Sequence, residues 1–512
     1  MIEKQLDCNK YLTQQINEKD IKTWNSKKVI LDCPTGMGKT TLINKVVAKV
    51  AGNENALVLF LSSRTSLSEQ QKENLKKLGV ENVQVITYQY LESILNRKGD
   101  FDASRYAFIV CDEAHYFTND AIFNDNTAIS YKWIEAQPTV VYMSATGYTV
   151  FKYMNDRQVV DINYYTSGDY SKVSTITFCH SDEHMIECIE DIYNSGEKGI
   201  IFMDKMVRDG ELGTRVHTPI MQWYLEHQDE AHFMCSKSRK DYKSINEIET
   251  AIVDGEFEKQ LLFCTQALEV GIDVTDTKCK HVMVELFDYD SVIQALGRIR
   301  NKDGIHYYIR VYDKRTLSGK AQTIKNNFID KAKDFEALNW EDRWDYCMKG
   351  RRFDSNKGLF FVDIFDDKRI KVNELMLYKY KDIYAQYMAC IIGVKEGYEQ
   401  LSKHAHVNRW MHDFNDLNFK GQFIDLAERD EANGTNEIKA YLECLVDIKL
   451  DKEQQKELIE KLNIRGKNGE LRKTVKPINA WLMENGFNYM IVNKKVSVNG
   501  NKFNAWIVTV CK

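Results

Sequence analysis

The segment that most constrains the fold is CPTGMGKTT at residues 33–41, which comes one residue after the apolar run at residues 29–31. Gly36 and Gly38 let the backbone turn sharply, so that successive N–H groups can point at one anion. A helix that begins near Lys39 would present its positive end to the same anion. A buried strand, a glycine-rich loop and a helix in this order predict a parallel α/β sheet that binds nucleotide phosphates.

This loop would supply the nucleotide ligands and one metal ligand. Lys39 would reach the β- and γ-phosphates, and the Thr40 hydroxyl would bind Mg²⁺. In the general pattern a glycine stands six residues before the lysine, whereas this chain has Cys33 there. We expect ATP and Mg²⁺ as cofactors, with nucleotide contacts from Pro34, Thr35, Gly36, Met37, Gly38, Lys39, Thr40 and Thr41.

Two adjacent acids follow a second apolar run at residues 108–111. Asp112 is placed to hold Mg²⁺, and Glu113 to position or deprotonate the attacking water. An Asp-Glu pair is usually a solvated surface pair. Because this pair follows a buried strand of the same predicted sheet, we expect Glu113 and Lys39 to be catalytic and Asp112 and Thr40 to bind the metal.

Strand-like and helix-like segments alternate twice along the chain. The first series has predicted strands at 29–33, 56–62, 83–87, 106–112 and 139–144, and the second has them at 173–178, 199–204, 231–235, 260–264, 281–286 and 305–312. Such alternation indicates parallel sheets with helices on both faces. Only the first series has a phosphate loop, so we expect two tandem α/β domains with a cleft between them.

The rest of the chain is expected to be mainly helical and then to change. Residues 320–345 and 370–460 have helical patterns, and a helix at 475–485 precedes strands at 489–492, 496–498 and 505–510. Turns are expected at 493–495 and 499–500, which gives a winged-helix-like ending. The expected domains are 1–165, 166–318, 319–455 and 456–512.

Charge is distributed unevenly. The whole chain carries a net charge of −5, but residues 461–512 hold ten Lys and Arg against two acids. A basic end on an acidic body is typical of a nucleic-acid-binding surface, and a solvated basic face is the alternative. No signal-peptide pattern and no membrane-length apolar run of about 18 residues is found, so we expect a soluble, cytoplasmic protein.

Taken in order, several segments resemble the motifs of superfamily 2 helicases of the DEAD/DEAH-box type. They are CPTGMGKTT, SSRT at 62–65, Thr87-Tyr88, DEAH at 112–115, Ser144-Ala145-Thr146, CTQALEVGID at 264–273 and QALGRIR at 294–300. The resemblance implies two tandem RecA-like parallel-sheet domains that bind ATP between them. A mainly helical accessory region and the basic winged-helix-like domain would follow.

The resemblance also implies roles for residues on both sides of the cleft. His115, Ser144 and Thr146 would couple the nucleotide site to domain movement, and His115 would meet Gln294 from the second domain. Arg298 would be the arginine finger that reaches the γ-phosphate. We therefore add Gln294 and Arg298 to the expected catalytic residues.

Nucleic-acid contacts and further nucleotide contacts are implied in the same way. Arg64, Thr87 and Thr265 would line the path of the nucleic-acid backbone, and Asp273 would touch the ribose. The last motif departs from the family pattern, because its second arginine is displaced to Arg300 and the usual position holds Asn301. Its usual first arginine is replaced by Ala295. Arg300 is kept as a nucleotide contact. The Gly-Arg-Ile-Arg form resembles that of viral origin-binding and phage-type replication helicases.

Three functions are consistent with these features. The first is a DNA helicase or translocase that hydrolyses ATP when nucleic acid is bound, acting as a monomer with a replication or loading protein as partner. The second is an initiator or clamp in which ATP is only a switch. The third is an RNA helicase, against which the lack of a clear glutamine motif in residues 10–28 counts.

One further cluster has spacing that a zinc site could use: Cys179, His180, His184 and Cys188. A structural zinc site needs four converging ligands, and nothing in the sequence indicates convergence. We therefore expect these residues, like the histidines at 404, 406 and 412, to be structural.

Overall fold

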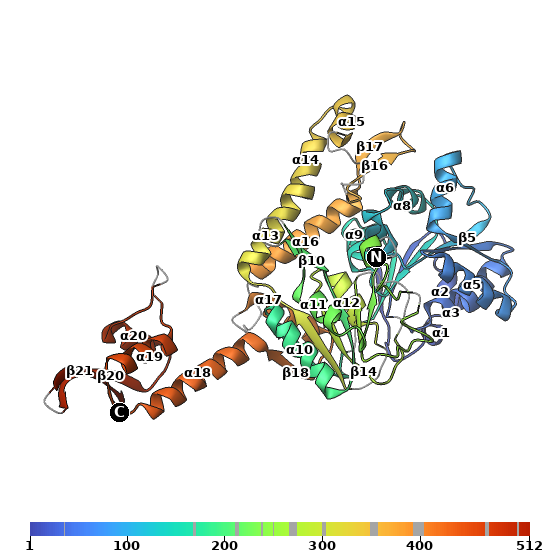
Figure 1. The fold of residues 1–512 in the computed structure, drawn as a ribbon. Coiled ribbons are helices and arrows are strands. Elements are labelled where there is room, and N and C mark those ends of the chain that lie inside the picture. Colours follow the sequence, from blue (N-terminus) through green and yellow to red (C-terminus); the bar gives the residue numbers. More distant parts are fainter. Residues whose placement is uncertain are drawn as a thin grey trace. The chain divides into compact units, whose positions relative to one another are not determined.

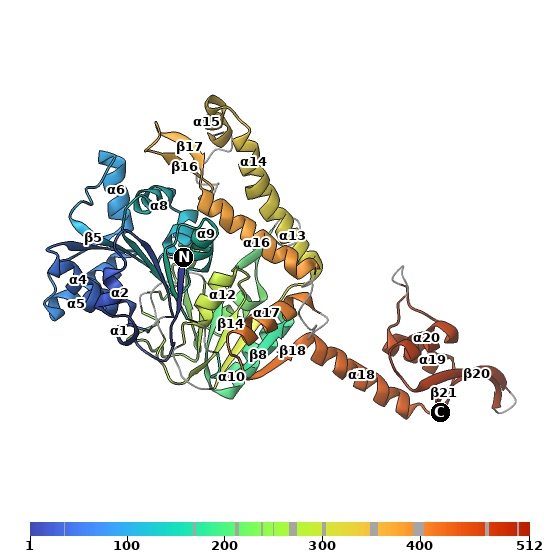
Figure 2. The same ribbon diagram turned by 180° about the vertical axis from the view of Figure 1, so that it is seen from behind.

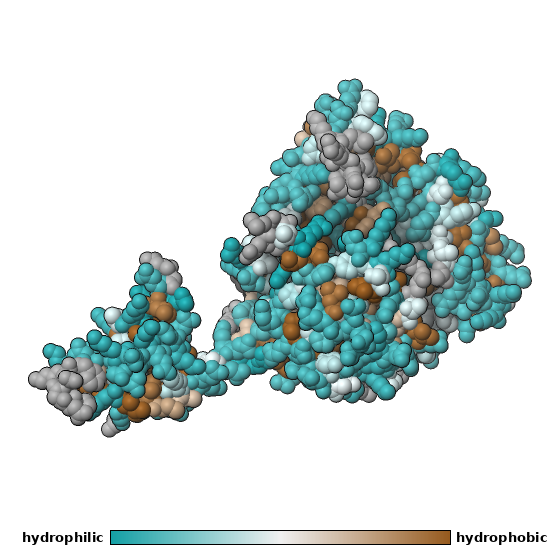
Figure 3. Space-filling model, in the orientation of Figure 1, coloured by the Kyte–Doolittle hydropathy of each residue, from teal (hydrophilic) through white to brown (hydrophobic). Residues whose placement is uncertain are grey.

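The computed structural model describes residues 1–512 apart from 35, 167–169, 210–213, 237–238, 249, 266–273, 300–303, 349–356, 393–403, 466–469, 499–500 and 512. The chain forms two compact units, Met1–Ile424 and Asp425–Lys512 (Figure 1). Among the described residues, no helix is both long enough and apolar enough to cross a membrane. In the view of Figure 3 the surface of each unit is mostly hydrophilic.

The first lobe of the larger unit is a seven-stranded parallel sheet. In order across the sheet the strands are β1 (Ile2–Gln5), β7 (Ile162–Tyr165), β2 (Lys28–Asp32), β6 (Val140–Ser144), β5 (Tyr106–Asp112), β3 (Leu57–Ser62) and β4 (Val83–Thr87). Val29 and Leu31 of β2 pack into one core and Ile30 into the core on the opposite face. Both faces are therefore covered, which explains the nearly continuous apolar runs in the sequence.

Helices cover both faces of this sheet. They are α1 (Leu12–Gln15), α2 (Glu18–Lys22), α3 (Lys39–Leu42), η1 (Ile43–Val47), α4 (Ala48–Asn53), α5 (Thr65–Leu78), α6 (Tyr88–Lys98), α7 (Tyr116–Asn119), η2 (Asp120–Ile122), α8 (Thr127–Glu135) and α9 (Tyr148–Asp156). The five strands predicted for this lobe are confirmed to within a residue or two. β1 and β7 were not predicted, because β1 is polar and exposed and β7 is only four residues long.

The second lobe repeats this architecture with another seven-stranded sheet. Its strand order is β12 (Ala231–Met234), β13 (Leu261–Cys264), β9 (Lys198–Phe202), β14 (Cys279–Val284), β15 (Ile305–Arg310), β8 (Val173–Cys179) and β18 (Gln422–Asp425). The helices are α10 (Asp182–Ser195), α11 (Pro219–Glu226) and α12 (Tyr289–Leu296), and a short hairpin joins β10 (Val207–Asp209) to β11 (Arg215–His217). The predicted tandem arrangement of two parallel-sheet lobes is confirmed.

An accessory region follows the second lobe. It contains α13 (Lys314–Ile324), η6 (Lys325–Asp330), α14 (Lys331–Glu336), α15 (Trp340–Met348), the hairpin β16 (Phe360–Asp363) and β17 (Arg369–Val372), α16 (Glu374–Ile392) and α17 (Ala405–Asp416). α16 contacts α7 and α9 of the first lobe as well as α13 and α17 (Figure 2). This long helix therefore spans both lobes. The prediction that helix begins at residue 370 is wrong, because β17 occupies 369–372 and helix starts at Glu374.

The smaller unit contains α18 (Leu426–Cys444), β19 (Lys449–Leu450), α19 (Lys452–Leu462), α20 (Val475–Glu484), β20 (Tyr489–Val498) and β21 (Asn501–Val510). Three helices with an antiparallel sheet in the order β19-β21-β20 match the expected winged-helix-like form. Its core includes Leu442 and Leu450, which is why the unit begins well before the expected boundary at 456.

The turn predicted at residues 493–495 is wrong. Asn493, Lys494 and Lys495 continue β20 and pair with residues 504–506 of β21. Their polar side chains resemble a turn sequence, but Lys494 and Lys495 are exposed side chains of one long hairpin. The second predicted turn, at 499–500, lies outside the described residues.

Candidate nucleotide-binding cleft

The phosphate loop connects β2 to α3 in the conformation that its glycines predict. Gly36 and Gly38 have φ values of 86° and 81°, which favour glycine over other residues. The Lys39 Nζ donates hydrogen bonds to the carbonyl oxygens of Cys33 and Pro34, at 2.6 and 3.1 Å, so the ammonium group lies inside the loop. Pro34, Gly36 and Met37 line a cleft, and Thr40 and Thr41 begin the helix beside them.

Two carboxylates lie close to this ammonium group. Burial, followed by the charge of Glu113, raises the pKa of Asp112 to about 7, and burial raises the pKa of Asp32 to about 6. In both cases the charge of Lys39 acts in the opposite direction, which indicates that Lys39 is near both groups. Carboxylate and hydroxyl oxygens suit Mg²⁺, so Asp112 and Thr40 fit the metal-binding role.

Asp32 was missed by the sequence analysis. It is the last residue of β2 and lines the cleft next to the phosphate loop. Its position at the carboxyl end of a central parallel strand was the available signal, because functional groups gather there.

His115 connects the DEAH segment to the strand that follows in the sheet. Its Nδ1 lies 3.1 Å from the Ser144 Oγ and 3.2 Å from the Thr146 Oγ1, and 3.4 Å from a carboxylate oxygen of Glu113. Burial lowers the pKa of His115, so the neutral ring is favoured. The structure therefore brings together the three residues expected to couple the nucleotide site to domain movement.

The second lobe completes the opposite wall of the cleft. A space of about 750 Å³ is lined by Asp32 and Glu113 from the first lobe and by Gln294 and Arg298 from the second. The charge of Arg298 is one of the causes that lower the pKa of His115, which places the guanidinium near the DEAH segment. The direct contact expected between His115 and Gln294 stays a prediction.

The N-terminal segment also lines this cleft, a contribution that the sequence analysis missed. Lys10 and Tyr11 face the space, and the Leu12 N–H donates to the Met37 carbonyl of the phosphate loop at 2.9 Å. The Gln15 side chain bonds the backbone of Asp7 and the carbonyl of Lys10, which fixes this segment. No sequence spacing pointed to Gln15, so its hydrogen bonds to this segment could be identified only in the structure.

The expected nucleic-acid contacts lie at or just after the carboxyl ends of strands. Arg64 comes after β3 and lies 3.9 Å from Asp120, while Thr87 ends β4 and accepts a hydrogen bond from the Tyr90 N–H. Thr265 follows β13 of the second lobe. Three of the expected nucleotide contacts, Thr35, Asp273 and Arg300, lie outside the described residues.

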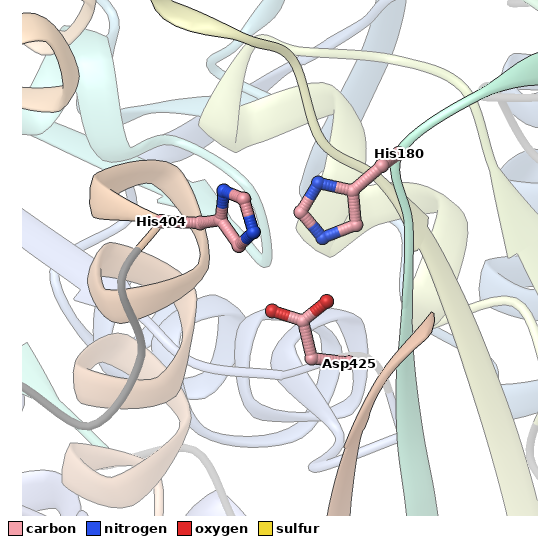
Figure 4. A group of neighbouring side chains, drawn as sticks. All are labelled: His180, His404 and Asp425. Atoms are coloured by element: carbon pink, nitrogen blue, oxygen red, sulfur yellow. The ribbon is translucent and has the colours of Figure 1, made fainter. Parts of the chain in front are cut away.

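The possible zinc ligands do not form one site. The Sγ atoms of Cys179 and Cys188 are 3.9 Å apart, whereas His180, the next residue after β8, has its ring 4.4 Å from that of His404 (Figure 4). Successive residues of an extended segment point to opposite sides, which separates Cys179 from His180. That these residues are structural stays a prediction, because His180 and His404 belong to a group of side chains that could hold a metal ion.

Comparison with known proteins gives similarities that agree with the motifs. Residues 2–84 match the family model described as type III restriction enzyme, res subunit. No curated protein matches the chain. The matched residues include the phosphate loop at residues 33–41, and the resemblance to superfamily 2 helicases stays a prediction.

Three solved structures resemble parts of the chain. Dbp5 of S. cerevisiae bound to RNA and ADP BeF3 is 16% identical over 58% of this chain and 83% of that chain, with a TM-score of 0.41. The helicase Lhr of Mycobacterium smegmatis, bound to ssDNA and AMP-PNP, is 15% identical over 70% of this chain and 58% of that chain, with a TM-score of 0.37. A DEAD box protein from Methanococcus jannaschii is 14% identical over 58% of this chain and 85% of that chain, with a TM-score of 0.32.

Proposed function

We propose that the chain is an ATP hydrolase stimulated by nucleic acid and that it acts as a helicase or translocase on DNA. The observation that carries this proposal is the single cleft that holds Glu113 and the phosphate loop on one side and Arg298 on the other. Phosphoryl transfer depends mainly on positioning and on neutralising the developing charge. Groups of both kinds face the same space here.

Each group has a defined task in this proposal. Lys39 and the loop N–H groups bind the phosphates, and Asp112 and Thr40 would hold Mg²⁺, which neutralises phosphate charge when it is bound. Glu113 orients the attacking water and accepts its proton. Arg298 stabilises charge on the γ-phosphate as the bond breaks. The base of the nucleotide would lie against the segment that carries Tyr11.

Movement follows from binding between two lobes. ATP that contacts both lobes binds an arrangement with the lobes together better than one with the lobes apart, and hydrolysis removes that preference. If a strand crosses both lobes near Arg64, Thr87 and Thr265, each cycle shifts the grip on its backbone. DNA is the favoured substrate because the smaller unit is winged-helix-like and its last 52 residues are basic.

The experiment is ATP hydrolysis measured alone and with single-stranded DNA or RNA homopolymers. We expect stimulation that is greater with DNA, and loss of turnover in Lys39→Ala and in Glu113→Gln. Glu113→Gln should still bind ATP. Hydrolysis that is equally fast in Lys39→Ala would assign the activity to a contaminant, and greater stimulation by RNA would reassign the substrate.

A further inference from the structure

The two lobes are joined by a buried carboxylate at the start of α9. The residue before this helix is Gly147, so its first turn lacks a side-chain cap of its own. Instead, the Thr149 N–H and hydroxyl both donate to the Asp290 Oδ2 of the second lobe, at 3.2 and 2.7 Å. Thr149 and Asp290 are each only 3% exposed. The second lobe thus caps a helix of the first.

The surroundings of Asp290 offset part of the cost of burying it. Burial and the nearby Asp288 raise the pKa of Asp290 to about 7, while the bonds from Thr149 and the charge of Lys379 oppose that shift. The positive end of α9 also favours a carboxylate at this position. Lys379 is 6% exposed, and its Nζ donates to the Asn119 Oδ1 of α7 at 3.0 Å.

α16 braces the same joint from the accessory region. Asp382 of α16 forms an ion pair with Lys152 of α9. Further along α16, Tyr387 stacks on Phe287, just before α12, with ring centroids 3.9 Å apart. α16 therefore contacts both α9, which carries Thr149, and the segment just before α12, which carries Asp290.

Both capped elements lead directly to the nucleotide site. α9 begins two residues after Thr146, which contacts His115. Asp290 lies in the first turn of α12, Gln294 is one turn further, and Arg298 follows the end of the helix. A shift of α12 relative to α9 would therefore move Arg298 relative to Glu113.

We propose that Asp290 is a positioning residue that fixes α12 on α9 and so keeps Arg298 at the nucleotide site. This inference rests on the proposed ATPase function. The change to test is Asp290→Ala. A displaced catalytic group can cost about a hundredfold in rate, so we expect kcat to fall by about tenfold to a hundredfold. The dissociation constant for ATP should change by less than about threefold, because Arg298 acts mainly as the bond breaks.

A double-mutant cycle with Arg298 separates positioning from a merely structural role. If Asp290 acts through Arg298, Asp290→Ala should cause no further loss of kcat in an Arg298→Ala background. Multiplicative losses would overturn the proposal. Asp290→Asn keeps an acceptor oxygen for the Thr149 N–H and should recover much of the activity, and Thr149→Val should cause a smaller loss than Asp290→Ala.

Asp313→Ala is the matched control. Asp313 caps α13 by accepting from the Thr316 N–H, so the same side-chain change removes a helix cap that does not join the lobes. The kcat of Asp313→Ala should stay within about twofold of wild type.

If Asp290→Ala does not fold, Asp290→Asn and Thr149→Val replace it in the double-mutant cycle with Arg298→Ala. An inactive wild type would contradict the proposed function, whereas an active wild type with an unaffected Asp290→Ala would contradict only this inference.

Discussion

Glu113 has a backbone conformation that glutamate rarely adopts. Its φ is 52°, in the left-handed region, and it stands next to the half-buried Asp112. Non-glycine residues in this region cost free energy, and such strain is concentrated at functional sites. The strain is therefore consistent with selection of Glu113 for chemistry rather than for folding.

This conformation gives a stability prediction. Glu113→Gly and Glu113→Gln both remove the carboxylate, so each should lower kcat by about a hundredfold to ten-thousandfold. Only the glycine variant relieves the backbone, and we expect it to be more stable than the glutamine variant by about 1 kcal/mol. Denaturant unfolding of the two variants measures the difference. A glycine variant less stable than the glutamine variant would show that the conformation carries no strain.

His406 should make the larger unit sensitive to acid. Burial, followed by the charge of Arg409, lowers the pKa of this ring from 6.5 to about 3. Below pH 6.5 the unfolded chain takes up a proton that the folded chain does not, so stability is lost as the pH falls toward 3. Between pH 7 and pH 5 this loss should be about 2 kcal/mol.

The comparison is wild type against His406→Gln, which has no titrating ring but can still accept from the Tyr312 N–H. Free energies of unfolding at pH 7 and pH 5 measure the effect. The variant should lose about 2 kcal/mol less than wild type between these values. An identical loss in both proteins would assign the acid sensitivity to other groups.

At the scale of elements, apolar runs predicted the buried strands of the first lobe. The strands β1 and β7 were not predicted, because β1 is polar and β7 is short. β2, β3 and β5 are buried on both faces and read clearly in the sequence. β20 continues through Lys494 and Lys495 because pairing with β21 overrides a turn-like sequence. The Asp290 cap could not be predicted, since it depends on how two lobes meet rather than on any local pattern.

The β20–β21 hairpin is the element expected to contact the DNA backbone. Lys494 and Lys495 are exposed on it, and each phosphate contact to duplex DNA contributes about 0.9 to the slope of log affinity against log salt. Lys494→Glu/Lys495→Glu should therefore weaken binding and reduce that slope by about 1.8. Binding to a duplex with a single-stranded tail, measured over a range of salt, tests this.

The control for the hairpin is Lys452→Glu/Lys456→Glu, which reverses two exposed charges on α19 instead. Equal effects of the two pairs would indicate a general charge effect. Truncation at Lys461 is a poor test, because it would expose Leu442, Leu450 and Leu458 of the same core. A truncation should instead remove the whole unit from Asp425.

At the scale of the whole molecule, the proposed translocase moves along a strand, whereas a clamp only closes on it. A translocase hydrolyses ATP throughout its path and leaves at the end, so its ATPase rate at saturating strand should rise with strand length and then level off. A clamp completes one cycle at each binding event, so its rate should not depend on length once its site is covered. We expect the first result with single-stranded DNA, measured from one binding site in length to several. Since both mechanisms close the same cleft, Arg298→Ala should lower the rate at every length. A wild-type ATPase rate that does not depend on strand length would contradict the translocase proposal and support the clamp, without contradicting the proposed ATP site.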